Sequence, residues 1–138
     1  MKGRKGFSLI EVGIAVVALA VVAKLSYPTF LDMLRRSRER DGKMNLGAIR
    51  SALSIYYDDV KAYPADASLL TQRQQYLLSM PPARTPNYHP DDNKIVNAAS
   101  ANDRGGWVYQ GDAAAADFGK VFVNCTHTDS KGNVWASY

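Results

Sequence analysis

The first half of the chain carries two successive hydrophobic patterns. Residues 7–23 are almost continuously apolar, interrupted only by Ser8, Glu11 and small residues. After a polar run at 35–41, apolar residues recur at intervals of three and four, which is typical of one face of a helix. They are Leu46, Ile49, Leu53, Tyr56 and Val60. Together the patterns predict a long helix over residues 7–60, apolar all round at its start and one-sided at its end.

The length of this helix predicts that part of it is covered by something other than its own domain. At 1.5 Å per residue it would measure about 80 Å, more than a compact domain of 138 residues can enclose. We therefore expect its first half to be buried in a membrane or among other subunits. The stretch 7–23 is at the short end of the length range of a membrane-spanning helix. Apolar residues up to Leu34 extend the apolar surface along one face of the helix.

Three residues are expected to weaken the helix locally. Pro28 has no N–H to bond the carbonyl of Lys24, so a kink or weakened turn is predicted there. Gly42 and Gly47 each add flexibility, at a cost of about 1 kcal/mol relative to alanine.

Beyond Tyr63-Pro64 the pattern is that of a small mixed domain. A short helix is predicted within residues 67–80, ended by two prolines, and 81–106 read as a long loop. The strands expected are Trp107–Gln110, Lys120–Cys125 and Asn133–Ser137, the last two joined by a hairpin turn at 129–132. The predicted fold class is α+β: a long N-terminal helix whose second half packs against a small C-terminal antiparallel sheet.

The net charge comes mainly from the N-terminus. The formal charge is +4, from 17 basic and 13 acidic residues, and Lys2, Arg4 and Lys5 precede the apolar run. Without these three the balance is 14 minus 13, or +1. The basic pI of 9.2 is therefore no argument for nucleic-acid binding by the body of the chain. Basic residues before an apolar segment are expected to stay on the cytoplasmic side.

The sequence contains no recognisable catalytic constellation. CxxC pairs, P-loops, GxSxG elbows and HExxH helices are all absent from it. Cys125 is the single cysteine, so no intrachain disulfide can form. His89 and His127 lie in polar, turn-rich contexts and are expected to be surface residues. We therefore expect neither enzymatic activity nor a cofactor.

Glu11 is the residue that most needs an explanation. A charge at the centre of a bilayer costs roughly 2.5–3.5 kcal/mol on insertion scales, so such a residue is expected to have a functional partner. Its context is the stretch KGFSLIEV, from Lys5 to Val12, followed by the apolar helix. This stretch resembles the N-terminus of type IV pilins and type II secretion pseudopilins. The motif similarity covers roughly residues 2–40, and YYDDVKAYP, from Tyr56 to Pro64, is similar to the helix exit of many pseudopilins.

The resemblance implies a processing site and a domain division. A membrane peptidase would cut between Gly6 and Phe7 and methylate the new amine of Phe7, and Pro28 falls at the family's helix-kinking proline. Residues 1–6 would be a cleaved cytoplasmic leader, 7–34 the transmembrane and filament-core half of the helix, and 35–138 a periplasmic or extracellular domain. The helix is expected to melt between about Ala20 and Pro28 on assembly.

The partner of Glu11 would then be the amine of Phe7. The two residues are one helical turn apart, so they can meet within a subunit in the membrane, whereas in a staggered filament Glu11 would meet the amine of a neighbour. An unpaired buried charge is heavily penalised, so the pair would set the register of assembly. The implied partners are other copies of the chain or related pilins, the prepilin peptidase, an inner-membrane assembly platform and, before assembly, the bilayer.

Other interpretations of the N-terminus remain open. Ala18-Leu19-Ala20 could be the cleavage site of a conventional signal peptide. The carboxylate of Glu11 argues against this, because the apolar segment of a signal peptide has no use for a charge. A single-pass anchor explains the length but not Gly6, Phe7 and Glu11 together. A periplasmic binding or interaction protein is therefore the alternative to a filament subunit. Within the family, a surface pilus and a periplasmic secretion pseudopilus both remain possible.

Two further sets of charged residues are candidate sites. Four arginines, at 35, 36, 38 and 40, would suit lipid phosphates or an acidic neighbour, but Glu39 and Asp41 between them make a solvated helix face at least as plausible. Asp112, Asp117 and Asp129 have the oxygen ligands that calcium prefers. The aspartate-proline-tryptophan-glycine stretch that major pseudopilins carry before such a loop is missing, so calcium is the minority interpretation.

Overall fold

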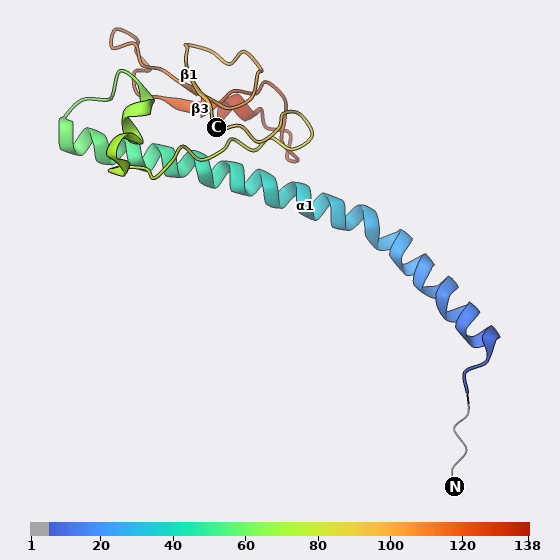
Figure 1. The fold of residues 1–138 in the computed structure, drawn as a ribbon. Coiled ribbons are helices and arrows are strands. Elements are labelled where there is room, and N and C mark those ends of the chain that lie inside the picture. The colour runs from blue at the N-terminus through green and yellow to red at the C-terminus, as the bar shows by residue number, and fades with distance from the viewer. Residues whose placement is uncertain (1–5) are drawn as a thin grey trace. The chain divides into compact units, whose positions relative to one another are not determined.

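The computed structural model describes residues 6–138 (Figure 1), so the predicted leader lies outside the described residues except for Gly6. The chain divides into two compact units, one ending at Arg35 and the other comprising Arg36–Tyr138, and each is described by itself. We call them the N-terminal unit and the C-terminal unit.

The long helix predicted from the sequence is present as α1, Leu9–Val60. It continues through Pro28, which therefore does not end the helix. In the N-terminal unit its apolar side chains are exposed on every side. In the C-terminal unit one face is buried, because Leu46, Ile49 and Leu53 enter the core as the spacing predicts. Tyr56 packs at the edge of the core, whereas Val60 is half exposed in the last turn of the helix.

The sheet packed against this half of α1 has three short strands and mixed topology. They are β1 (Ile95–Asn97), β2 (Trp107–Tyr109) and β3 (Val121–Val123), in the order β1-β2-β3. β2 pairs with β3 antiparallel, as expected, and Val108 lies opposite Phe122. β1 pairs with β2 parallel, with Ile95 opposite Trp107. The prediction of a purely antiparallel sheet was therefore wrong, because β1 lies in the segment read as a loop.

The predicted strand over residues 133–137 is also wrong. Only Thr128 and Val134 form an antiparallel bridge, and the chain then enters a 3-10 helix, η3 (Trp135–Ser137). The backbone N–H of Trp135 donates to the carbonyl of His127 at 2.9 Å, and that of Ala136 donates to the carbonyl of Cys125 at 3.0 Å. These bonds turn the fully buried Trp135 into the core. The predicted turn at 129–132 is present, with the N–H of Gly132 bonded to the carbonyl of Asp129.

The short helix expected within 67–80 is replaced by two 3-10 helices, η1 (Ala67–Leu70) and η2 (Gln72–Gln74). Asp66 caps η1 by accepting from the N–H of Ser68 at 2.8 Å. Arg73 has φ of 56°, in the left-handed region, so a continuous helix is interrupted there. The result is a compact connection that places the fully buried Leu70 in the core.

Candidate functional site

The predicted processing residues lie directly before α1. Gly6 and Phe7 have no regular secondary structure and are exposed, Phe7 to 87%. The helix begins two residues later, at Leu9. The peptide bond between Gly6 and Phe7 therefore lies in exposed backbone outside the helix, where a protease can reach it.

Glu11 closes the first turn of α1. Its carboxylate accepts a hydrogen bond from the backbone N–H of Ser8 at 3.1 Å, and the carbonyl of Ser8 accepts from the N–H of Val12 at 3.2 Å. A serine before a helix and a glutamate three residues later form a capping box, in which the glutamate satisfies one unpaired N–H of the helix start. The Ser-x-x-Glu spacing of Ser8 and Glu11 is visible in the sequence, whereas our prediction gave Glu11 only a charged partner.

The helix that follows Glu11 presents a continuous apolar surface. Near its N-terminus α1 is long and apolar enough to cross a membrane, and none of this apolar stretch is buried among the described residues. Its exposed large side chains include Ile10, Val12, Ile14, Val16, Val17, Leu19, Val21, Val22, Leu25, Tyr27, Phe30, Leu31, Met33 and Leu34. An exposed patch of this extent marks an interaction surface.

In the C-terminal unit the turn at 129–132 is bonded to α1 through Asp129. The carboxylate of Asp129 accepts from Lys43 Nζ and from the hydroxyl of Tyr138, each at 2.6 Å. It also accepts from the backbone N–H groups of Lys131 and Asn133, both at 2.9 Å. Burial opposes ionisation of this carboxyl, but these hydrogen bonds outweigh it and hold the pKa of Asp129 well below its usual range. Asp129 is therefore an ionised structural group that docks the turn.

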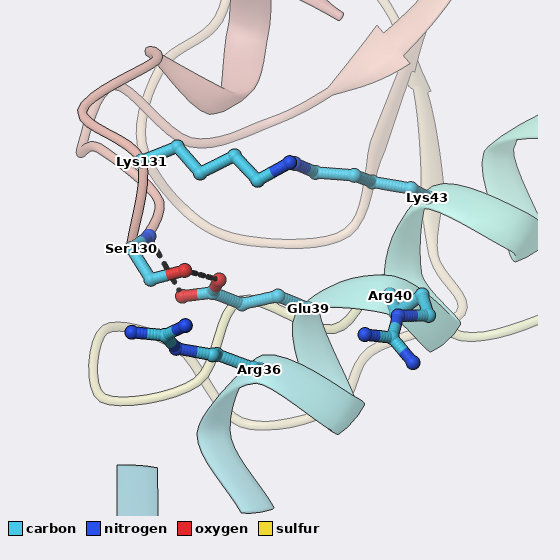
Figure 2. Close-up of a pocket in the computed structure, with 6 residues that line it drawn as sticks. All are labelled: Arg36, Glu39, Arg40, Lys43, Ser130 and Lys131. Atoms are coloured by element: carbon cyan, nitrogen blue, oxygen red, sulfur yellow. Dashed lines mark hydrogen bonds between the residues drawn. The ribbon is translucent and has the colours of Figure 1, made fainter. Parts of the chain in front are cut away.

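A second bond between the turn and α1 lies at an open pocket of about 400 Å³. Glu39 is buried, and its carboxylate accepts from both the backbone N–H and the hydroxyl of Ser130. Figure 2 shows these two bonds, with Arg36 beside Glu39. Arg40 lies one turn of α1 after Arg36. The pocket lining is predominantly basic: Arg36, Glu39, Arg40, Lys43, Ser130 and Lys131. Its chemistry suits an acidic group more than an apolar one.

The structure does not bring the three aspartates considered for calcium together. Asp112 accepts from the N–H of Ala114 at 2.9 Å within its own turn, and Asp117 lies 3.5 Å from Lys120. Asp129 is engaged by Lys43, as described above. Among residues 6–138, the group of His, Cys and acidic side chains close enough to share a metal ion does not include any of them.

That group consists of His89, Asp103, Cys125 and His127, whose ligand atoms all lie within 4.8 Å of one another. Sequence reasoning assigned the two histidines to the surface and left Cys125 without a role. The residues come from three separate loops, so only the Cys-x-His spacing of Cys125 and His127 was visible in the sequence.

Three curated relatives of the chain are pilus proteins. Fimbrial protein EcpC of Eikenella corrodens is 33% identical over 63 residues, 46% of this chain and 41% of that protein. The type IV major pilin protein PilA of Myxococcus xanthus is 30% identical over 59 residues, 43% of this chain and 27% of the relative. The type IV narrow pilus major component PilA5 of Thermus thermophilus is 30% identical over 60 residues, 44% of this chain and 52% of the relative.

The matched segments thus span from 27% to 52% of the length of these relatives. No family model matches the chain, and no solved structure does. The fold of a long N-terminal helix packed in its second half against a small C-terminal sheet is nevertheless pilin-like. The chain is thus similar to type IV pilins over less than half of its length, and its fold has the same pilin-like arrangement of helix and sheet.

Proposed function

We propose that the chain is a non-enzymatic structural subunit of a type IV pilus or pilus-like filament. The observation that carries this proposal is the apolar surface of the N-terminal unit, which no described part of the chain covers. Exposing an apolar surface of this extent to water is energetically unfavourable. A bilayer would cover it before assembly, with the N-terminus cytoplasmic and the C-terminal unit outside. The same helices of neighbouring subunits would cover it in the filament.

Processing by a prepilin peptidase would prepare the subunit for assembly. Cleavage between Gly6 and Phe7 would leave Phe7 as a cationic N-terminus, and methylation of that amine would keep its charge. The accessibility of these two residues before α1 favours this step. Small residues of the helix, among them Gly13, have open space around them and would allow neighbouring helices to approach closely.

Glu11 would have two successive partners. In the single subunit it caps its own helix at the N–H of Ser8. In the filament the methylated amine of Phe7 from a neighbouring subunit would compete for the same carboxylate. A buried pair need not stabilise the filament by itself, but a misplaced subunit would leave one charge without a partner. Glu11 would thereby select the correct axial register.

Among members of the family, a surface pilus is favoured over a secretion pseudopilus. The relatives are named as a fimbrial protein, a type IV major pilin and a narrow pilus major component.

The basic pocket at Arg36, Arg40 and Lys131 would face an acidic surface of an adjacent subunit or of the assembly platform.

The experiment that tests this proposal separates capping from charge pairing at Glu11. Glutamine serves at this position of a capping box as glutamate does, but it carries no charge. We expect Glu11→Gln and Glu11→Ala to insert and to be processed as the wild type is, and both to be absent from sheared filaments. Immunoblots of the membrane and sheared fractions measure subunit level and assembly in the same cells.

A result in which Glu11→Gln assembles normally while Glu11→Ala fails would show that capping alone matters and would refute the charge pair. Normal assembly of both variants would remove any role of Glu11 in the filament. If the wild-type chain itself never enters a filament fraction, the proposed function is wrong.

A further inference from the structure

Four side chains with metal-binding atoms converge at one edge of the C-terminal unit. His89 comes from the loop before β1, Asp103 from the loop between β1 and β2, and Cys125 and His127 from the segment after β3. Cys125 is fully buried, His89 and Asp103 are partly buried, and the ring of His127 reaches the surface. The group is therefore enclosed on one side and open to solvent on the other.

The backbone around this group is held by hydrogen bonds independent of the four side chains. Asn102 and Asn124 bond each other reciprocally: the Asn102 N–H donates to Asn124 Oδ1 and Asn124 Nδ2 donates to Asn102 Oδ1, both at 2.8 Å. Asn124 is itself buried. This pair fixes Asp103 beside Cys125, because each asparagine immediately precedes one of them in the chain.

The two histidines are positioned as firmly. The carbonyl of Thr85 accepts from the N–H of His89 at 3.3 Å, closing the turn that presents this ring. The carbonyl of His127 is bonded to Trp135 of η3, and the ring of Tyr88 stacks on the ring of His127 with centroids 4.2 Å apart. The backbone of both histidines is therefore held in place, and the stacking contact with Tyr88 orients the ring of His127.

Three distances between these atoms match the spacing of ligand atoms in a tetrahedral zinc site. Zn–N and Zn–O distances near 2.0–2.1 Å and Zn–S near 2.3 Å place tetrahedral ligand atoms roughly 3.3–3.6 Å apart. Asp103 Oδ1 lies 3.2 Å from His89 Nε2 and 3.3 Å from His127 Nδ1. Cys125 Sγ lies 3.6 Å from His127 Nδ1. These three ligand-atom distances thus have tetrahedral spacing, and all four ligand atoms lie within 4.8 Å of one another.

We propose that His89, Asp103, Cys125 and His127 form a four-coordinate binding site for Zn²⁺. The donor set of two nitrogens, one oxygen and one sulfur suits this ion, whereas calcium and magnesium take oxygen ligands. Copper(I) favours sulfur ligands over a carboxylate, and copper(II) and nickel(II) favour tetragonal geometry. With Asp103 and Cys125 ionised, the two negative charges neutralise the ion.

The surroundings supply the support that metal ligands need. The N–H of Thr126 donates to Asp103 Oδ1 at 2.8 Å, orienting the carboxylate as an outer-shell partner does. That backbone bond is the main reason that the pKa of Asp103 is lowered to about 2, so the carboxylate is ionised at neutral pH. Burial raises the pKa of the Cys125 thiol. Zinc binding therefore releases the thiol proton to solvent as the Zn–S bond forms.

The test uses the full chain in detergent micelles, with Zn²⁺ and Co²⁺ as the probes. Competition with a chromophoric chelator is expected to show one Zn²⁺ per chain. Co²⁺ is expected to give a thiolate-to-metal charge-transfer band together with the intense visible bands of tetrahedral cobalt. Zinc at a hundredfold excess over its Kd is expected to raise the Tm of the C-terminal unit by about 10 °C.

Variants decide whether these four residues hold the ion. We expect Cys125→Ser to abolish the charge-transfer band, and His127→Gln to weaken zinc binding at least tenfold. Because Cys125 is buried and its variant risks misfolding, the half-exposed His127 gives the decisive variant. Asp117→Asn is the matched control, since this exposed carboxylate lies outside the group.

The site is refuted if the wild-type chain binds no stoichiometric zinc, or if Co²⁺ binds without a thiolate band. It is refuted equally if folded His127→Gln binds zinc as tightly as the Asp117→Asn control. None of these outcomes depends on filament assembly, so the zinc site and the proposed function stand or fall separately.

Discussion

Two glycines in α1, five residues apart, are expected to respond to alanine with opposite signs. Gly47 is exposed, and a Cβ added there meets nothing within 4 Å. Gly42 is buried, and a Cβ there would lie 2.6 Å from the backbone carbonyl oxygen of Arg84. Gly42 therefore permits the close approach of the 81–84 segment to the helix, whereas Gly47 only costs backbone entropy.

The magnitudes follow from two terms. Both substitutions gain about 1 kcal/mol of helix propensity, so Gly47→Ala is expected to stabilise the C-terminal unit by up to that amount. At Gly42 an overpacking cost of about 1–3 kcal/mol opposes the same gain. The difference between the two variants cancels the propensity term and isolates the overlap with Arg84.

The 81–84 segment has little freedom to relieve this overlap. The carbonyl of Pro81 accepts from Trp107 Nε1 at 2.7 Å, and that of Pro82 accepts from Asn45 Nδ2 at 2.8 Å. Arg84 also pairs with Asp41 on α1 at 2.8 Å. We therefore expect the overlap to cost an amount in the upper part of the range and Gly42→Ala to be clearly less stable than the wild type.

Tryptophan fluorescence during urea or thermal unfolding measures this difference in the full chain. Trp107 and Trp135 are the two tryptophans of the sequence, and both are fully buried in the C-terminal unit. For a unit of about 100 residues, each 1 kcal/mol shifts the Tm by at least roughly 4 °C. Equal stabilisation by both variants would show that the 81–84 segment does not pack on Gly42 and would refute this reasoning.

Four other predictions concern the turn, its ion pair with Lys43, the leader and calcium. The pKa of Asp129 is depressed in the folded state, so its stabilising effect is complete above the ordinary aspartate pKa and is lost as the pH falls through the lower folded value. The free energy of unfolding of the wild type is therefore expected to fall with pH below about pH 4, and that of Asp129→Asn to fall less steeply. Lys43→Met, which removes the cation from this buried carboxylate, is expected to cost about 2–3 kcal/mol in urea unfolding at pH 7, and a cost below 0.5 kcal/mol would show that the pair contributes little. Gly6→Leu is expected to block processing and leave a full-length membrane species, so mature protein in this variant would refute the cleavage assignment. Millimolar calcium is expected to leave the Tm unchanged, and a reproducible rise of several degrees would show that the separated aspartates do bind it.

Sequence periodicity was sufficient to predict the long helix α1 and its buried face. Leu46, Ile49 and Leu53 lie in the core because their spacing matches the helical repeat, and the turn at 129–132 forms because its residues favour that backbone. β1 was missed because three residues, Ile95–Asn97, are too short to show an alternating pattern.

The failed strand prediction at 133–137 has a tertiary cause. Val134 and Trp135 favour a strand by composition, but their segment is bonded to the carbonyls of Cys125 and His127 as a 3-10 helix. This arrangement buries the indole of Trp135 completely. Burial of a large aromatic side chain thus decided the backbone conformation over local propensity.

The candidate sites differ in how far the sequence could predict them. The motif at Gly6, Phe7 and Glu11 is contiguous, so sequence alone suggested it, although the capping role of Glu11 required the structure. The pairing of Lys43 with Asp129 joins residues 86 positions apart, and the cluster around Asp103 joins three loops. A single sequence carries no signal for contacts of this kind.

The mass of the N-terminal peptide tests the central claim most directly. The mature chain would be isolated from the filament fraction of cells that make it, digested, and sequenced by mass spectrometry. We expect the peptide to begin at Phe7 and to carry a methyl group on its amine. A peptide beginning at Val21 would instead identify a conventional signal peptide, and one beginning at Met1 would show that the leader is retained; either result would contradict processing as a pilin.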